Sequence, residues 1–294
     1  MNNTNYLSLS FDLLYRNVTA GKRILPQVYV LGAPKCGTTA LYEILCQHPN
    51  FLPPFFNVKE LNYLQDIPNY VPYDYRGILK VLFNSLFGTY TDAKSYRKFF
   101  PLIAEVNKLK RDTNANVVSG DFSPIYLYSD VAAKRIKAIT PEAKLIIMLR
   151  NPVKRAYSEY NMFFERTPFE NRSFEQAIED ESNNVSLNHY VIESYIKRGI
   201  YEPYIKTYLD LFDKKQVMII KSEDFFTQTP KVVEEVLNFV ELPINTFNLN
   251  ELYYRNETSY NNQIKPETCQ ELVTYYKPYN SKLSNYLDMD FEWS

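Results

Sequence analysis

The stretch Gln27-Val-Tyr-Val-Leu-Gly-Ala-Pro-Lys-Cys-Gly-Thr-Thr39 decides the fold class. Its first part, 27–32, is an apolar run that is rich in valine and ends in glycine, which predicts a buried strand. Residues 38–47 have apolar side chains at helical spacing, and Pro49 predicts the end of that helix. We therefore expect a strand, a glycine-containing loop and a helix. The backbone N–H groups at the start of such a helix suit an anionic phosphate.

The loop differs from the P-loop of nucleotide triphosphatases. That pattern places a lysine directly after its second glycine, whereas Thr38 follows Gly37 here and the lysine comes earlier, at Lys35. Those enzymes also hold magnesium, in part with an aspartate at the end of a hydrophobic strand, but strand 144–149 is followed by Arg150. Arginine binds anions rather than cations. The sequence thus predicts a phosphate site without a metal site; the alternative for the loop alone is a structural turn.

Strand-like and helix-like segments alternate along the rest of the chain. Strands are predicted at 117–121, 144–149 and 216–220, and helices over 130–139, 152–165, 199–212 and 230–240, with a helical pair over 267–287. Strand 144–149 is almost wholly apolar, which is typical of a parallel sheet covered on both faces. We therefore expect an α/β fold with a P-loop-type parallel β-sheet flanked by helices on both faces.

The absence of an internal repeat or a low-complexity linker favours one domain over 1–294. Residues 1–25 are expected to be an N-terminal arm that packs on the body or frays. Residues 66–111 are rich in Tyr, Phe and Lys, and we expect short helices and loops there, as an insertion or lid on the acceptor side of the site.

Composition excludes several classes of protein. With 33 Lys+Arg against 34 Asp+Glu among 294 residues, the net charge of −1 argues against a nucleic-acid-binding surface. Three cysteines and two histidines fit neither a disulfide framework nor a zinc site. The sequence shows no signal-peptide pattern and no long apolar run, so we expect a cytoplasmic protein without a membrane partner.

Two motifs resemble those of sulfotransferases that use 3′-phosphoadenosine 5′-phosphosulfate (PAPS). Pro34-Lys-Cys-Gly-Thr-Thr39 is similar to their 5′-phosphosulfate loop. Lys144-Leu-Ile-Ile-Met-Leu-Arg-Asn-Pro-Val-Lys-Arg-Ala-Tyr-Ser158 is similar to their 3′-phosphate motif, a strand that ends in arginine with a serine eight residues later. Lys59-Glu-Leu-Asn-Tyr-Leu64, Arg198-Gly-Ile-Tyr201 and Phe291-Glu-Trp293 resemble the carbohydrate, heparan-sulfate-type branch and its bacterial relatives.

The resemblance implies roles for individual residues in binding the donor. The nucleotide-binding loop would consist of Lys35, Cys36, Gly37, Thr38 and Thr39. Within it, Lys35 would be catalytic, because it would neutralise charge on the leaving oxygen, and the glycine and threonines would donate hydrogen bonds to the 5′-phosphate. Arg150 and Ser158 would hold the 3′-phosphate. The alternatives are an exposed loop lysine, a structural ion-pair arginine and an ordinary helix serine.

The resemblance also implies that Glu60 is the general base that takes the proton of the acceptor. Its alternative is a solvated charge pair with Lys59. If Glu60 is not the base, His189 or Asp121 would be the next candidates, whereas His48 is expected only to end a helix.

The sequence departs from the family pattern in the region of the acceptor. Phe122 stands where heparan-sulfate enzymes carry a lysine, so a second active-site cation is missing or supplied elsewhere. Asp121 or Ser123 is a candidate substrate contact. Arg255 and Lys265, where the family closes over the nucleotide, are candidates for phosphate contacts.

We therefore expect an enzyme that transfers a sulfuryl group from PAPS to a hydroxyl, with an amine as second choice, and without a metal. The near-neutral charge and the tyrosine-rich insertion favour a small metabolite or a sugar as acceptor over a long sulfated polymer, as in a tailoring enzyme of bacterial secondary metabolism. The alternatives are a P-loop kinase or nucleotide hydrolase and a non-catalytic nucleotide-binding protein. The acceptor, the position sulfated and the oligomeric state stay open.

Overall fold

The centre of the molecule is a parallel sheet of four strands in the order β2-β1-β3-β4. A computed structural model describes residues 4–65, 92–166, 170–183, 194–254 and 263–293. The strands are β1 (Val28–Gly32), β2 (Gly120–Asp121), β3 (Lys144–Leu149) and β4 (Val217–Lys221). The α/β class and the parallel sheet are confirmed. Strand β2 is shorter than predicted, because Val118 forms an isolated bridge with Phe51 instead of extending it.

The register of the sheet determines which segments lie together at its carboxyl edge. Val28 of β1 is opposite both Gly120 of β2 and Lys144 of β3, and Leu145 of β3 is opposite Val217 of β4. Because all four strands run in the same direction, their carboxyl ends lie at one edge. The segments that follow the strands therefore meet at this edge, where ligands bind in open α/β sheets.

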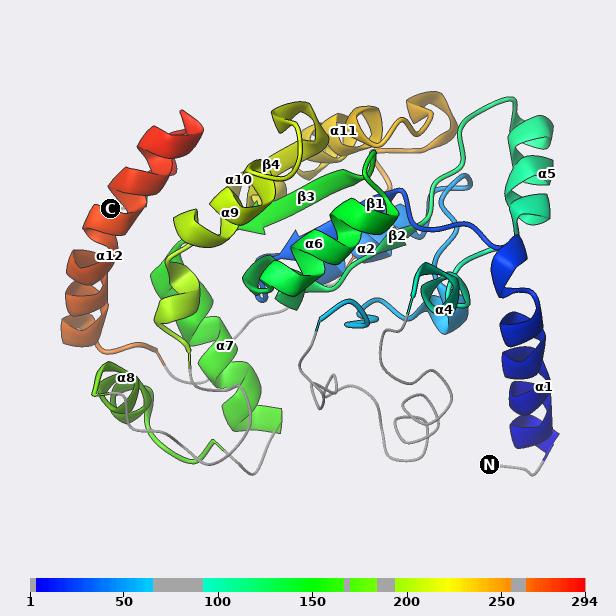
Figure 1. Cartoon of the computed structure of the whole chain (residues 1–294). Helices are drawn as coiled ribbons and strands as arrows, with labels where there is room; N and C mark the ends of the chain where they lie inside the picture. The colour runs from blue at the N-terminus through cyan, green and yellow to red at the C-terminus, as the bar shows by residue number, and fades with distance from the viewer. Residues whose placement is uncertain (1–3, 66–91, 167–169, 184–193, 255–262, 294) are drawn as a thin grey trace.

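Helices cover both faces of the sheet. Figure 1 shows α6 (Asp130–Ile139) and α9 (Glu202–Leu209) in front of it and α2 (Thr38–Leu45) behind it. The connection from β1 to β2 contains α2 and moves toward the β2 edge of the sheet. The connection from β2 to β3 contains α6 and moves in the opposite direction, across β1. Right-handed crossovers in opposite directions put their helices on opposite faces. Strand β1 is fully buried between these layers, and so is β3 apart from Lys144.

The remaining helices surround this core. They are α1 (Thr4–Val18), α4 (Ala93–Arg97), α5 (Ile103–Thr113), α7 (Pro152–Arg166), α8 (Phe174–Ser182), α10 (Ser222–Thr227), α11 (Thr229–Phe239) and α12 (Pro266–Leu287). Within the predicted insertion, α4 and α5 confirm short helices after residue 91, and 66–91 lies outside the described residues. Among the helices described, none combines the length and the apolar character needed to span a bilayer.

The N-terminal arm forms helix α1, and its last turns pack on the body. Leu13 is buried, and the Arg16 guanidinium lies 3.8 Å from the ring centroid of Phe55. Arg16 also donates a 3.0 Å hydrogen bond to the Lys98 carbonyl.

Two helix predictions need correction. The helical pair predicted over 267–287 is the single helix α12, which continues through Pro278. An interior proline costs about 3 kcal/mol, and burial of Tyr276 and Leu283 where α12 packs on α7 and α9 offsets this cost. The helix predicted over 199–212 is shorter, because Pro203 sets the first turn of α9 and a 3-10 helix, η4 (Lys197–Gly199), precedes it.

A buried ion cluster joins α7 to η4. Arg155 on α7 is fully buried and donates from Nη1 to Glu159 Oε2 at 2.6 Å. Arg198 of η4 donates to the other carboxylate oxygen at 2.7 Å. Although burial opposes ionisation of Glu159, Arg198 and Arg155 hold its pKa below the ordinary value. One carboxylate thus compensates two buried guanidinium groups.

Glu159→Gln keeps the size of the side chain but removes the carboxylate that pairs with both buried arginines. We expect a loss of about 3–5 kcal/mol in the free energy of unfolding, because removing one partner of a buried ion pair leaves the charge of the other partner uncompensated. Urea unfolding measures this. The control is Asp210→Asn, which removes an exposed pair with Lys206 and should cost less than about 1 kcal/mol. Equal, small losses for the two variants would contradict the importance of the cluster.

Candidate active site

The loop from β1 to α2 has a backbone that only particular residues can adopt. Lys35 lies in the left-handed region with φ 68°, and Gly37 has φ 93°. A Cβ at position 37 would lie 3.1 Å from the Phe226 ring and 3.2 Å from the terminal methyl carbon of Met148. Glycine is therefore required at 37 by both its φ and the close approach of its neighbours.

Hydrogen bonds from two neighbouring strands hold this loop. Ala33 N–H donates to the Met148 carbonyl of β3 at 2.6 Å. Ser222, directly after β4, donates to the Cys36 carbonyl at 2.6 Å. Cys36 is fully buried, and burial raises the pKa of its thiol to about 11. The thiol is thus protonated at neutral pH, so Cys36 contributes its backbone and not a nucleophile.

The start of α2 is suited to an anion. Gly37 is the N-cap and supplies no side-chain cap, and the first N–H groups of an α-helix have no partners within the helix. The helix dipole adds partial positive charge at the same place. Thr38 is buried and Thr39 is exposed at this first turn. The uncapped helix start and the glycine cradle fit a phosphate-containing ligand.

Arg150 completes this anion site from β3. Its Nη1 donates to the Lys35 carbonyl at 3.2 Å, so the two predicted phosphate ligands lie together. The buried Tyr201 donates to the Arg150 carbonyl at 2.8 Å. Asn151 N–H donates to Glu223 Oε1 at 2.9 Å, which anchors the next residue as well. The position of Arg150 is therefore fixed through its backbone.

Sequence reasoning did not find these supporting residues. Tyr201 belonged to the motif Arg198-Gly-Ile-Tyr201, but its spacing gave no indication of a contact with Arg150. Gly199 in that motif packs closely, because a Cβ there would lie 2.7 Å from Tyr276 Oη. No signal in the sequence marked Ser222 or Glu223, since both act through contacts that exist only once β4 lies beside β3.

Ser158 lies on α7, one turn beyond Arg155, and is fully buried. Its hydroxyl is therefore enclosed by protein in this structure, whereas the Arg150 side chain is partly exposed. The two residues predicted for the 3′-phosphate thus differ in accessibility.

Glu60 reaches the same edge of the sheet on the side of β2. Its Oε1 lies 2.7 Å from Lys59 Nζ, and 29% of the Glu60 side chain is exposed. The Lys59 carbonyl accepts a 3.2 Å hydrogen bond from Phe122 N–H, directly after β2. Because β1 and β2 are adjacent and parallel, this contact places Glu60 and the Lys35 loop at one sheet edge.

Phe122 is a core residue, and Asp121 and Ser123 on either side of it are buried as well. Phe122 is fully buried, with its ring centroid 5.0 Å from that of Tyr42. Asp121 and Ser123 are also fully buried, and Ser123 Oγ donates to Asp121 Oδ1 at 2.6 Å. Both side chains are thus used within the protein, and the cation found beside Glu60 is Lys59.

The other candidate residues lie apart from this edge or outside the described residues. His48 is buried; its Nδ1 accepts from Asn50 N–H at 3.0 Å, and its Nε2 lies 2.9 Å from the Pro243 carbonyl. Burial lowers its pKa, which favours a neutral structural imidazole. Lys265 is exposed and forms a 3.6 Å pair with Glu175. Arg255 and His189 lie outside the described residues.

The buried carboxyl of Asp121 predicts a pH dependence of stability. Burial raises its pKa to about 6, although hydrogen bonds from Ser123 and two tyrosines oppose this. Between its ordinary pKa and about 6 the folded state binds more protons, so stability falls as pH rises through this interval. We expect the stability of wild type relative to Asp121→Asn to fall from pH 4 to 6, by at most about 1.4 kcal/mol per unit. Urea unfolding across this range measures the difference. A flat difference would contradict the shift.

Comparison with known proteins identifies the family. The family model described as "Sulfotransferase domain" matches residues 25–283. Human carbohydrate sulfotransferase 15 is 27% identical over 327 residues, which cover 92% of this chain and 55% of that protein. Bifunctional heparan sulfate N-deacetylase/N-sulfotransferase 1 of Caenorhabditis briggsae is 25% identical over 239 residues, 79% of this chain and 24% of that protein. The chain thus spans about half the length, or less, of these relatives.

A solved structure agrees with the family match. The crystal structure of a sulfotransferase from Alicyclobacillus acidocaldarius superposes with a TM-score of 0.70 and 26% sequence identity. The superposition covers 92% of this chain and 99% of that one. The resemblance carried by the loop around Lys35 and the motif around Arg150 is confirmed, and the chain belongs to the sulfotransferase domain family.

Proposed function

We propose that this protein transfers a sulfuryl group from PAPS to a hydroxyl group of a sugar. The observation that carries the proposal is the contact of Arg150 with the backbone of Lys35 beside the uncapped start of α2. It concentrates positive charge where a nucleotide with several phosphates needs it. Glu60 reaches the same sheet edge, which supports a role for it as the base.

Binding of the donor divides between two groups of residues. The N–H groups at the start of α2 and the hydroxyls of Thr38 and Thr39 bind the 5′-phosphate, and Lys35 neutralises charge on it. Arg150 binds the 3′-phosphate as a bidentate donor. Ser158 joins Arg150 only if the packing around α7 opens, because its hydroxyl is buried. We therefore expect Arg150 to contribute more to affinity than Ser158.

The reaction requires a positioned hydroxyl and a proton acceptor. PAPS supplies a sulfuryl group whose bond to the 5′-phosphate oxygen breaks as the acceptor oxygen bonds to sulfur. Glu60 takes the hydroxyl proton, since a neutral hydroxyl is a poor nucleophile. Lys59 pairs with the Glu60 carboxylate at 2.7 Å, which fixes the position of the base. Lys35 balances the charge that develops on the leaving oxygen.

A sugar acceptor has more support than another small metabolite. Two relatives are named for carbohydrate and heparan sulfate substrates. The net charge of −1 offers no broad basic surface for a long polyanion. We therefore propose a short or weakly charged saccharide, with a hydroxyl preferred to an amine.

The first test is nucleotide binding without metal. Adenosine 3′,5′-bisphosphate in EDTA should raise the melting temperature, because a ligand at one hundred times its Kd adds about 2.7 kcal/mol. Arg150→Ala should abolish the shift at the same concentration, and Ser158→Ala should reduce it less. A shift that occurs only with ATP and magnesium would favour the kinase alternative instead.

The second test examines Glu60 as the general base. Glu60→Gln keeps the size of the side chain but accepts no proton, so we expect kcat to fall by about 10²–10⁴-fold. Binding of adenosine 3′,5′-bisphosphate should stay unchanged. The control is Glu142→Gln, an exposed glutamate on the loop before β3, which should retain the wild-type rate. Unchanged turnover in Glu60→Gln would refute Glu60 as base.

A further inference from the structure

We propose that Asp121 is a positioning residue for Glu60, acting through the hydroxyls of Ser123 and Tyr126; this inference rests on the proposed role of Glu60 as base. The first observation concerns the loop that follows Glu60, where hydrogen bonds fix successive backbone N–H groups. Asn62 N–H donates to Ser123 Oγ at 2.9 Å. Tyr126 Oη accepts from the next two, Tyr63 N–H at 2.8 Å and Leu64 N–H at 3.1 Å.

The hydroxyls that hold this loop are themselves oriented by one carboxylate. Ser123 Oγ donates to Asp121 Oδ1 at 2.6 Å, and Tyr126 Oη donates to Oδ2 at 3.0 Å. Tyr96 Oη, from α4, donates to the same Oδ2 at 2.6 Å. Asp121, Ser123, Tyr96 and Tyr126 are fully buried. These bonds therefore form in a dry interior, where a missing partner is costly.

The chemistry of this network requires an acceptor at 121. An ionised carboxylate only accepts hydrogen bonds, so each neighbouring hydroxyl must turn its proton toward it. The oxygens of Ser123 and Tyr126 then present lone pairs to the N–H groups of residues 62–64. An amide at 121 would present donors, which would turn at least one hydroxyl around. The lone pairs of that hydroxyl would then no longer face the loop that carries Glu60.

Residues 121–128 also contact β1, the strand that leads into the Lys35 loop. Asp121 is opposite Tyr29 of β1. The 3-10 helix η3 (Pro124–Tyr128) packs on Gly32, where a Cβ would lie 2.7 Å from Leu127 Cβ and 2.8 Å from the Pro124 carbonyl oxygen. Residues 121–128 are thus in contact with both halves of the site. They set the distance between the base and the donor loop.

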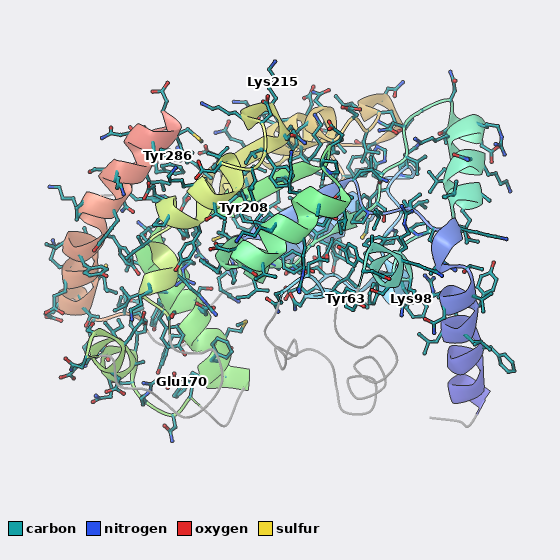
Figure 2. The ribbon with its side chains drawn as sticks, viewed as in Figure 1. Tyr63, Lys98, Glu170, Tyr208, Lys215 and Tyr286 are labelled. Carbon is teal, nitrogen blue, oxygen red and sulfur yellow. The ribbon has the colours of Figure 1, made fainter. Side chains whose placement is uncertain are left out.

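Residues around η3 anchor this segment from other elements. Tyr208 of α9 donates to the Tyr126 carbonyl at 2.6 Å. The ring of Tyr63, on the loop after Glu60, stacks on that of Tyr96 with centroids 5.8 Å apart and an interplanar angle of 4°. Figure 2 shows Tyr208 between α9 and α6, and Tyr63 at the opposite margin of the body near Lys98. Asp121 thus connects the central layers to the loop of the base.

The test compares Asp121→Asn and Tyr126→Phe with wild type, each also in the Glu60→Gln background. We expect kcat to fall about 10–100-fold in each single variant, since a small misplacement of a catalytic group can cost about 10²-fold. The KM for PAPS and the affinity for adenosine 3′,5′-bisphosphate should change less than about 3-fold. In the Glu60→Gln background the same changes should cost no further activity, because a displaced base matters only when a base is present.

Tyr29→Phe is the matched control for Tyr126→Phe. It removes a buried tyrosine hydroxyl on β1, one that lies 3.0 Å from Thr140 Oγ1. It should retain the wild-type kcat. If Asp121→Asn does not fold, Tyr126→Phe carries the test, because it leaves the carboxylate in place.

Three results would overturn the inference. These are a wild-type kcat in both variants, equal losses with and without Glu60, or loss of nucleotide binding together with kcat. The failure of the proposed function looks different: Glu60→Gln itself would then turn over at the wild-type rate, and the inference would fall with it. A slow Glu60→Gln with fully active Asp121→Asn and Tyr126→Phe would refute the positioning role alone.

Discussion

The parallel pairing of β1 with β2 and β3 is the constraint on which the rest of the structure depends. It brings the ends of three strands to one edge, and each supplies a different part of the site. Strand β1 leads into the Lys35 loop, β3 ends at Arg150, and β2 ends at Asp121 beside the loop of Glu60. A register slip in this sheet would separate Glu60 from the Lys35 loop while leaving each motif intact in sequence. The chemistry therefore depends on backbone pairing as much as on side chains.

Around this edge, the protein uses buried polar groups to fix backbone rather than to bind ligand. Tyr201 holds the Arg150 carbonyl, and Ser222 holds that of Cys36. Asp121 and its hydroxyl partners hold the loop after Glu60 in the same way. Each bond is made in the interior, where loss of one partner leaves the other unsatisfied. Lys35, Thr39 and Glu60, by contrast, are at least partly exposed to solvent.

The sequence predicted the layout of the fold because its signals are local. An apolar run, a glycine and a helical spacing were enough for β1, the Lys35 loop and α2. The helical pair predicted over 267–287 was wrong, because packing of Tyr276 and Leu283 carries the single helix α12 through Pro278. The role of Asp121 stayed open between a substrate contact and an alternative base, because its burial and its hydrogen-bond partners depend on segments distant in sequence. Tyr96 and Tyr126 reach it only in the folded chain.

We propose that a sulfuryl group is transferred to a sugar hydroxyl at the sheet edge that carries Lys35, Arg150 and Glu60. The most direct measurement is mass spectrometry of products after incubation with PAPS, EDTA and a panel of short desulfated saccharides. We predict a singly sulfated saccharide and adenosine 3′,5′-bisphosphate in equal amounts, with none formed by Arg150→Ala under the same conditions. PAPS that is bound but left unconsumed across saccharide, phenol and amine acceptors would contradict the account and indicate a binding protein.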